Sequence, residues 1–146
     1  NPLLVALCGI VPTAYVHYTT APYVAAIHIH VPPYARWSRQ ILERFARTAP
    51  PSTKLDITTI SAIGKPRVSS MTLGDLRPTR ARFGIVNFAR DTTKLNSERA
   101  WWRWRAVGQF GVQEASQGLN EKRLKNGWVW SLLAETIRNR AGPAKK

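Results

Sequence analysis

The first 35 residues contain no Lys, Arg, Asp or Glu, whereas all 22 basic and 8 acidic residues follow them. Residues 3–18 supply 16 mostly apolar positions, interrupted by one proline, and residues 21–31 supply 11 more. A helix that crosses a bilayer needs about 20 mostly apolar residues, and proline is better tolerated there than in soluble helices. We therefore expect a membrane span over residues 2–18, followed by an interfacial connector over residues 19–35.

Tyrosines and histidines occur at intervals along this uncharged region. Their rings suit the boundary between lipid and water, because part of each ring is apolar and part is polar. An alternative is that residues 1–35 are an ordinary core segment, or an extended tail threaded through a large assembly. The predicted membrane-interface residues are Tyr15, Tyr18, Tyr23, His28, His30 and Tyr34.

The net charge of +14 belongs entirely to the region after residue 35. A charge of this size implies an anionic partner, which is nucleic acid, acidic lipid or an acidic protein surface. The basic residues are spread out, and six Trp, four Tyr and four Phe in the chain argue for a packed core. If the apolar region spans a membrane, the basic domain lies on the side that retains positive charge, the cytosolic or matrix side.

The region after residue 35 has the pattern of an α+β domain, in which an antiparallel sheet of about four strands lies between two helices. Prolines bracket the first helix, and a Gly-Lys-Pro turn at 64–66 joins the first two strands into a hairpin. The first helix is predicted to place Trp37, Ile41, Leu42, Phe45 and Ala46 on its apolar face. The predicted elements are a helix within 34–49, strands at 54–63, 67–73, 82–90 and 101–112, and a helix at 128–140.

The chain is therefore expected to consist of an apolar membrane-associated segment and connector (1–35), a basic domain (36–140) and a disordered tail (141–146).

The strand predicted at 101–112 contains the sequence "WWRWR", which invites a nucleic-acid interpretation. Its period-two alternation places Trp102 and Trp104 on one face and Arg103 and Arg105 on the other. A base-stacking platform needs exposed aromatic rings, so we expect the tryptophans to lie in the core. The arginines then point outward, where they can contact phosphates without reading sequence.

The sequence offers little for catalysis or metal binding. It contains no phosphate-binding loop, nucleophile elbow, metalloprotease helix or dinucleotide fingerprint. His28 and His30 share one face of a strand, but the chain has only one further histidine, so we expect interfacial polar residues rather than a metal site. The single cysteine, Cys8, excludes an internal disulfide and is expected to be a buried small hydrophobic residue rather than a nucleophile. We predict no enzyme activity, no metal and no cofactor.

The order of these parts resembles a known family. The stretches that carry the resemblance are "TAPYVAAIHIHVPPYARWSRQILERFA", "PPSTKLDITTISAIGKPRVSSMTLGDLRP", "RFGIVNFARD" and "GWVW", within about residues 3–140. They are similar to fungal mitochondrial inner-membrane proteins that have a short transmembrane part and a matrix domain, one family of which serves as a mitoribosome receptor. Members of that family have two membrane helices, whereas this chain contains one candidate. Because the chain begins with Asn rather than Met, we expect an N-terminal piece to precede it.

The resemblance implies a membrane protein that tethers the mitochondrial ribosome to the inner membrane during co-translational insertion. Its basic domain would face the matrix, and its partners would be the ribosome and inner-membrane lipid, with the membrane insertase as a further candidate partner. The alternatives are a structural subunit of a mitochondrial ribonucleoprotein and an assembly factor for a respiratory-chain complex. The residues predicted to contact rRNA or ribosomal protein are Arg80, Arg82, Arg90, Arg103, Arg105, Lys122, Arg123 and Lys125.

Overall fold

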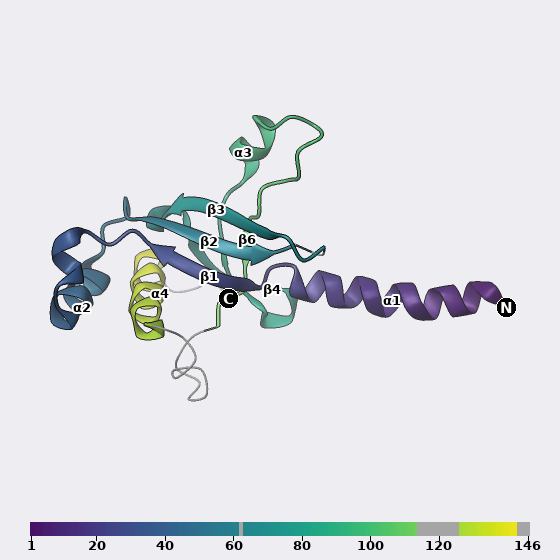
Figure 1. Cartoon of the computed structure of the whole chain (residues 1–146), viewed down its shortest axis with the longest axis horizontal. Helices are drawn as coiled ribbons and strands as arrows, with labels where there is room; N and C mark the ends of the chain where they lie inside the picture. The colour runs from purple at the N-terminus through teal and green to yellow at the C-terminus, as the bar shows by residue number, and fades with distance from the viewer. Residues whose placement is uncertain (62, 114–125, 143–146) are drawn as a thin grey trace.

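The computed structural model describes residues 1–61, 63–113 and 126–142. The protein is an α+β domain from which a long N-terminal helix projects (Figure 1), as the sequence predicts. The helices are α1 (Pro2–Thr20), α2 (Arg39–Thr48), α3 (Thr93–Ser97) and α4 (Gly127–Ala141), with short 3-10 turns η1 (Pro33–Arg36), η2 (Leu73–Asp75) and η3 (Arg82–Gly84). The strands are β1 (Val24–Ile29), β2 (Lys54–Ile60), β3 (Pro66–Thr72), β4 (Arg77–Ala81), β5 (Val86–Ala89) and β6 (Gln109–Phe110).

Helix α1 has no buried residue, and Figure 1 shows it extending away from the sheets. Cys8 is therefore exposed on the helix, whereas the sequence predicts that it is buried. The threonine hydroxyls of the helix bond back to its own backbone: Thr13 donates to the Gly9 carbonyl at 2.6 Å, and Thr20 donates to the Val16 carbonyl at 2.7 Å. The helix therefore satisfies its threonine hydroxyls without water. By length and composition alone, it is the one helix in the described part of the chain that could cross a membrane.

The strands form two antiparallel three-stranded sheets, β1-β2-β3 and β4-β5-β6, rather than the single sheet of about four strands that the sequence predicts. An isolated parallel bridge between Tyr23 and Gly111 joins them. The Gly111 amide donates to the Pro22 carbonyl at 2.7 Å, and the Val24 amide donates to the Gly111 carbonyl at 3.1 Å. A Cβ at position 111 would lie 2.6 Å from the Ile85 carbonyl oxygen, so this junction requires glycine.

Strand β1 corrects the expected boundary at residue 35. Residues 19–35 were predicted to be a connector outside the basic domain, yet β1 pairs with β2 from Val24↔Thr59 to Ile29↔Leu55. The folded domain thus includes the uncharged strand that follows α1. Val24, Ile27 and Ile29 of this strand pack against the core, whereas His28 and His30 are exposed.

Two further strand predictions were too long. The strand expected at 82–90 begins at Val86, because Arg82, Phe83 and Gly84 all have positive φ and form the turn η3. The strand expected at 101–112 is confined to Gln109–Phe110. The hairpin predicted around 64–66 is confirmed, with β2 and β3 paired from Lys54↔Thr72 to Ile60↔Pro66.

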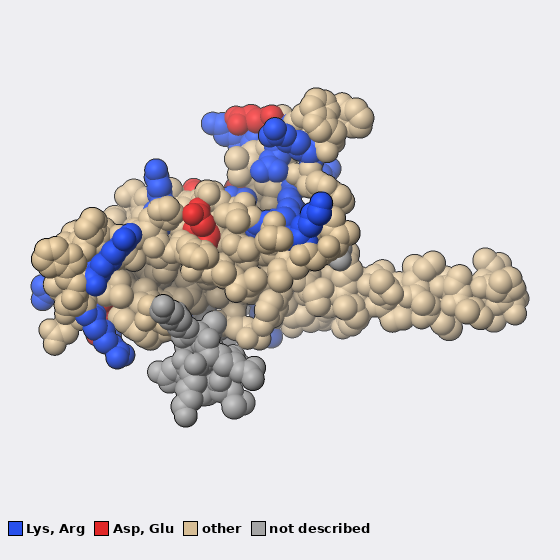
Figure 2. All heavy atoms as spheres, viewed as in Figure 1, with Lys and Arg blue, Asp and Glu red and all other residues tan. Residues whose placement is uncertain are grey.

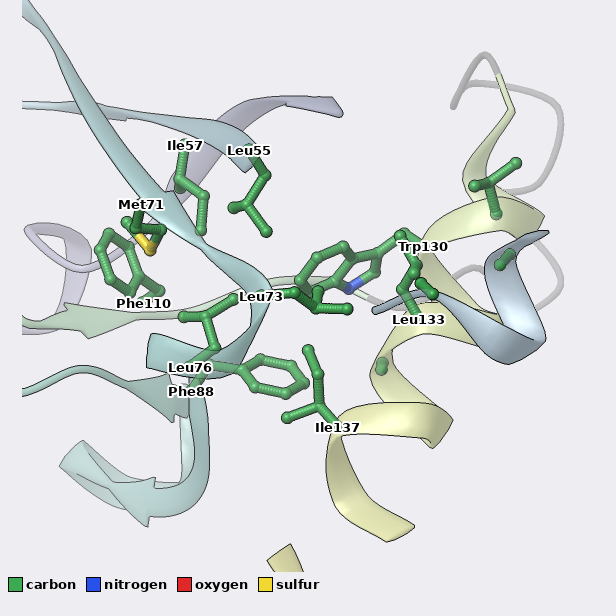
Figure 3. Close-up of a cluster of buried hydrophobic side chains, with 14 of the residues drawn as sticks. Leu55, Ile57, Met71, Leu73, Leu76, Phe88, Phe110, Trp130, Leu133 and Ile137 are labelled. Atoms are coloured by element: carbon green, nitrogen blue, oxygen red, sulfur yellow. The ribbon is translucent and has the colours of Figure 1, made fainter. Parts of the chain in front are cut away.

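The core lies where helix α4 meets both sheets. Trp130 of α4 packs edge-on against Phe88 of β5, with ring centroids 5.4 Å apart at 76°. Figure 3 shows the Trp130 side chain extending from α4 toward the strands, together with Leu133 and Ile137 of the same helix. The main cluster is Ala35, Phe45, Ala46, Ala49, Leu55, Ile57, Met71, Leu73, Leu76, Phe88, Phe110, Val129, Trp130, Leu133, Ala134 and Ile137.

Helix α2 packs against α4 at one end of this core. The Thr136 hydroxyl donates to the Ala46 carbonyl at 3.3 Å, which links the two helices. Phe45 and Ala46 are buried as predicted, but Trp37 precedes α2 and is 86% exposed, so its predicted place on the apolar face was wrong.

Candidate interaction surfaces

The most prominent surface feature is a projecting segment between α3 and β6, which we call the tryptophan arm (residues 98–107). Figure 1 shows α3 and this segment standing away from the sheets. Trp101 is 92% exposed, Trp102 69% and Trp104 78%. The Trp101 and Trp102 rings contact each other edge-on, with centroids 5.8 Å apart at 86°. Three large apolar rings are therefore exposed to solvent on one segment. A single exposed apolar side chain is common on protein surfaces, but a cluster of this kind marks an interaction site.

Side chains from outside and within the arm hold its backbone in place. Arg67 of β3 donates to the Arg105 carbonyl at 2.5 Å, and Arg99 donates to the Trp104 carbonyl at 2.9 Å. The Ala106 amide donates to the Asn96 side-chain oxygen at 2.8 Å. These bonds satisfy the backbone groups that a neighbouring strand would otherwise pair.

The arm overturns the prediction that Trp102 and Trp104 are buried opposite Arg103 and Arg105. All four side chains are exposed. Alternation creates a buried face only where a strand lies in a sheet that covers a core. Here the alternating residues precede β6 and pair with no strand among the described residues. The Arg67 side chain, rather than a neighbouring strand, donates the hydrogen bond to the Arg105 carbonyl.

The predicted anionic-partner residues lie in different surroundings. Arg103 and Arg105 are exposed on the arm, and Arg80 is exposed on β4. Figure 2 shows basic side chains gathered at the base of the arm, while α1 carries neither basic nor acidic side chains. Lys122, Arg123 and Lys125 lie outside the described residues.

Arg90 is a structural residue rather than a freely presented cation. Its guanidinium donates to the Val107 carbonyl at 2.8 Å and to the Ser70 carbonyl at 3.4 Å, and it lies 5.8 Å from the Phe110 ring centroid. Partial burial lowers the pKa of Arg90 from its usual value, with a smaller effect from Arg99. The sequence prediction missed this role, and it also missed Arg67 and Arg99 as supports of the arm.

Arg82 is also engaged within the protein. It lies in the turn η3 and donates to the Tyr18 carbonyl of α1 at 2.6 Å, while its guanidinium sits 4.4 Å from the Tyr18 ring centroid. Next to it, the Phe83 ring lies 6.4 Å from the Tyr15 ring. Two of the predicted membrane-interface tyrosines thus contact the turn between β4 and β5.

The other predicted interface residues do not share this location. Tyr23 is exposed beside the bridge at the end of α1, but β1 then leads away from α1. Five strand steps of about 3.3 Å place Ile29 roughly 17 Å beyond Val24. His30 and Tyr34 therefore lie at the far end of β1, and the structure does not bring the six predicted residues together.

His28 and His30 flank a carboxylate on the outer face of the first sheet. Asp56 of β2 is paired across the ladder with His28, and its Oδ2 lies 2.9 Å from the His30 Nε2. Hydrogen bonds from the Ser70 side chain and then from His30 lower the pKa of Asp56 from its usual value. Within the described residues no group of three or more His, Cys, Asp or Glu could hold a metal. The sequence spacing did not reveal that Asp56 of β2 is the partner of these two histidines.

Comparison of the chain with protein-family models, with curated proteins and with solved structures gives no match.

Proposed function

We propose that this chain is a non-catalytic, membrane-anchored binding protein that holds the mitochondrial ribosome at the inner membrane for co-translational insertion. The observation that carries the proposal is the separation of two surfaces. An uncharged helix with no buried residue projects from one side of a domain that carries all of the net charge of +14. A helix of this kind needs an apolar environment, whereas a domain with this charge attracts an anionic partner.

The tryptophan arm supports RNA as the anionic partner. Exposed aromatic rings can stack on unpaired bases, and neighbouring arginines can contact phosphates, with little dependence on base sequence. Trp101, Trp102 and Trp104 are exposed, and the exposed Arg103 and Arg105 are their neighbours in the sequence. The arm is therefore suited to an unpaired rRNA loop, a kind of site that a membrane-bound receptor can reach on a ribosome.

Helix α1 and the resemblance support the choice of membrane and compartment. If α1 crosses the inner membrane, the positive charge of the domain favours retention in the matrix, where mitochondrial ribosomes translate. The insertase is a neighbour of the ribosome in that arrangement, and the resemblance to mitoribosome receptors implies it as a further partner.

Co-sedimentation of the full chain with mitochondrial ribosomes tests the arm. Replacing Trp101, Trp102 and Trp104 by Ala should reduce binding at moderate salt by at least tenfold, since base stacking contributes about 1–3 kcal/mol per ring. Trp37→Ala is the matched control, because Trp37 is 86% exposed at the other end of the domain and should be dispensable. Unchanged binding by the triple variant would exclude the arm as the ribosome contact.

Alkaline carbonate extraction tests the anchor separately. A protein that spans the membrane through α1 stays in the pellet, and a soluble ribonucleoprotein subunit is released. Affinity purification then distinguishes the partners: ribosomal proteins and rRNA support the proposal, whereas recovery of respiratory-chain subunits alone would favour an assembly factor.

A further inference from the structure

Two turns of the domain flank the C-terminal half of α1, and each exposes an apolar residue. We propose that this end of the domain is a second lipid-binding surface, in which Phe83 and Ile63 enter the headgroup region of an anionic bilayer on either side of α1. The inference rests on the proposed function only in requiring that α1 crosses the membrane.

The turn η3 presents Phe83 toward the helix. Phe83 is 82% exposed, and its ring lies 6.4 Å from that of Tyr15. Arg82, Phe83 and Gly84 have φ values of 48°, 61° and 86°, a conformation that bulky residues rarely adopt. The surrounding structure must enforce this backbone, and the Arg82 bond to the Tyr18 carbonyl is one contact that does so. The effect of the turn is to hold an apolar ring out of the domain and against the helix.

The turn between β2 and β3 lies against a different face of the same helix. Ile60 and Ser61 line a hollow together with Val16 and Thr20 of α1, and Ile60 and Ile63 are exposed. At about 100° per residue, Val16 and Thr20 lie on the side of α1 away from Tyr18. Helix α1 therefore leaves the domain between two apolar tips, as Figure 1 shows for the turns nearest its C-terminal end.

The depth of the Phe83 contact matches a membrane interface. Phe83 contacts Tyr15, which precedes the last residue of α1, Thr20, by five positions. Five residues of helix correspond to about 7.5 Å. If Thr20 marks the edge of the bilayer, Phe83 reaches a depth within the roughly 5–10 Å at which interfacial apolar groups reside.

The charge of the two turns fits anionic headgroups. Residues 60–67 and 77–86 contain no Asp or Glu. Arginine and lysine beside interfacial aromatic rings are typical of segments that bind lipid phosphates. The basic residues of these two segments are Lys65, Arg67, Arg77, Arg80 and Arg82. Arg67 and Arg82 donate to carbonyls within the protein, so Lys65 and Arg80, which is exposed, are the cations nearest the two tips for lipid phosphates.

Depth-dependent quenching in vesicles tests the inference. The full chain is reconstituted in phosphatidylcholine vesicles containing an acidic phospholipid, with a fluorescent label on a single cysteine. Phe83→Cys and Ile63→Cys are made in a Cys8→Ser background, with Tyr34→Cys, at the far end of the domain, as the control. Labels at positions 83 and 63 should be quenched several-fold more strongly by a nitroxide at the lipid headgroup than by a water-soluble quencher, and the label at position 34 should show the reverse.

A label on the native Cys8 distinguishes failure of this inference from failure of the anchor. Cys8 is exposed on α1, so an inserted helix should place its label deep in the bilayer. A deep label at position 8 with water-accessible labels at positions 83 and 63 would overturn the second lipid surface and leave the anchor intact. A water-accessible label at position 8 would overturn both. Protection of position 83 that appears only when other membrane proteins are added would assign the surface to a protein instead of lipid.

Discussion

The guanidinium of Arg82 donates a hydrogen bond to the backbone carbonyl of Tyr18 at 2.6 Å and also covers the Tyr18 ring, 4.4 Å from its centroid. The carbonyls of the last turn of a helix have no partner within the helix, and a cation there interacts favourably with the helix dipole. One arginine thus satisfies the end of α1 and fixes the helix to the β4–β5 turn.

Replacing Arg82 by Gln should loosen α1 without unfolding the domain. The loss of the bond and of the ring contact leaves the helix free to pivot about residues 21–23. Fluorescence anisotropy of a dye on Cys8, measured in detergent, should fall relative to the parent chain. Arg80→Gln is the control, because Arg80 is exposed on the neighbouring strand and should not change the anisotropy.

Gly111→Ala should destabilise the domain by about 1–3 kcal/mol, the usual cost of forcing an atom into a packed site. The added Cβ would meet the Ile85 carbonyl oxygen at 2.6 Å and push apart the junction of the two sheets. Denaturant unfolding measures the loss. Gly108→Ala should cost less, because its closest neighbour would be the Thr92 side chain at 3.1 Å, and an equal loss in both variants would contradict the argument.

Arg90→Ala should lower the free energy of unfolding by about 1.5–3 kcal/mol, the range for hydrogen bonds to a charged group. The substitution leaves the Val107 and Ser70 carbonyls without their guanidinium donor. Arg103→Ala should leave stability unchanged, since its side chain is exposed on the arm. Thermal unfolding of both variants distinguishes a structural arginine from one that is presented to a partner.

Salt dependence measures how many phosphates the arm contacts. For single-stranded nucleic acid the logarithm of affinity falls with the logarithm of salt concentration by about 0.7 per phosphate contact. The double variant Arg103→Gln/Arg105→Gln should therefore reduce that slope by about 1.4 when each arginine contacts one phosphate. Binding of a single-stranded RNA oligomer, titrated at several salt concentrations, gives the slope. A slope equal to that of the parent chain would show that these arginines do not contact RNA phosphates.

Acid should weaken the outer face of the first sheet through Asp56. Its pKa is lowered in the folded state by the Ser70 and His30 hydrogen bonds, so the ionised carboxylate is stabilised by folding. That contribution is fully present above the ordinary carboxyl pKa and is lost as pH falls toward the lowered folded-state value. Unfolding measured from pH 6 down to pH 3 should show a smaller loss of stability in Asp56→Asn than in the parent chain.

The sequence predicted the elements whose signals are local. The β2–β3 hairpin follows from its β-branched strands and from Gly64, which has a φ of +76° in the turn. Helix α4 follows from its apolar periodicity. Both are set by residues close together in the chain, so their patterns survive without knowledge of the whole fold.

Two of the failures, at the tryptophan arm and at β1, share one cause, which is that residues distant in the sequence decide the structure. The tryptophan arm has the alternation of a strand, but Arg67, 38 residues before Arg105, takes the backbone carbonyl of that residue. Strand β1 has the composition of a membrane segment, yet its ladder partner lies beyond α2. The exposed tryptophans were the part of the candidate site that sequence reasoning placed in the core, because it assumed a neighbouring strand that the fold does not supply.

The way in which α1 continues into β1 determines how the domain resists a pulling force. Figure 1 shows β1 leading away from α1 in roughly the direction of the helix, so tension applied through the helix acts along the strand. The β1–β2 hydrogen bonds and the bridge to Gly111 run across that direction. They are loaded in shear and must break together rather than one after another. If the domain binds a ribosome while α1 is held in a membrane, tension between the two would act along α1 and β1, the direction in which the domain best resists unfolding.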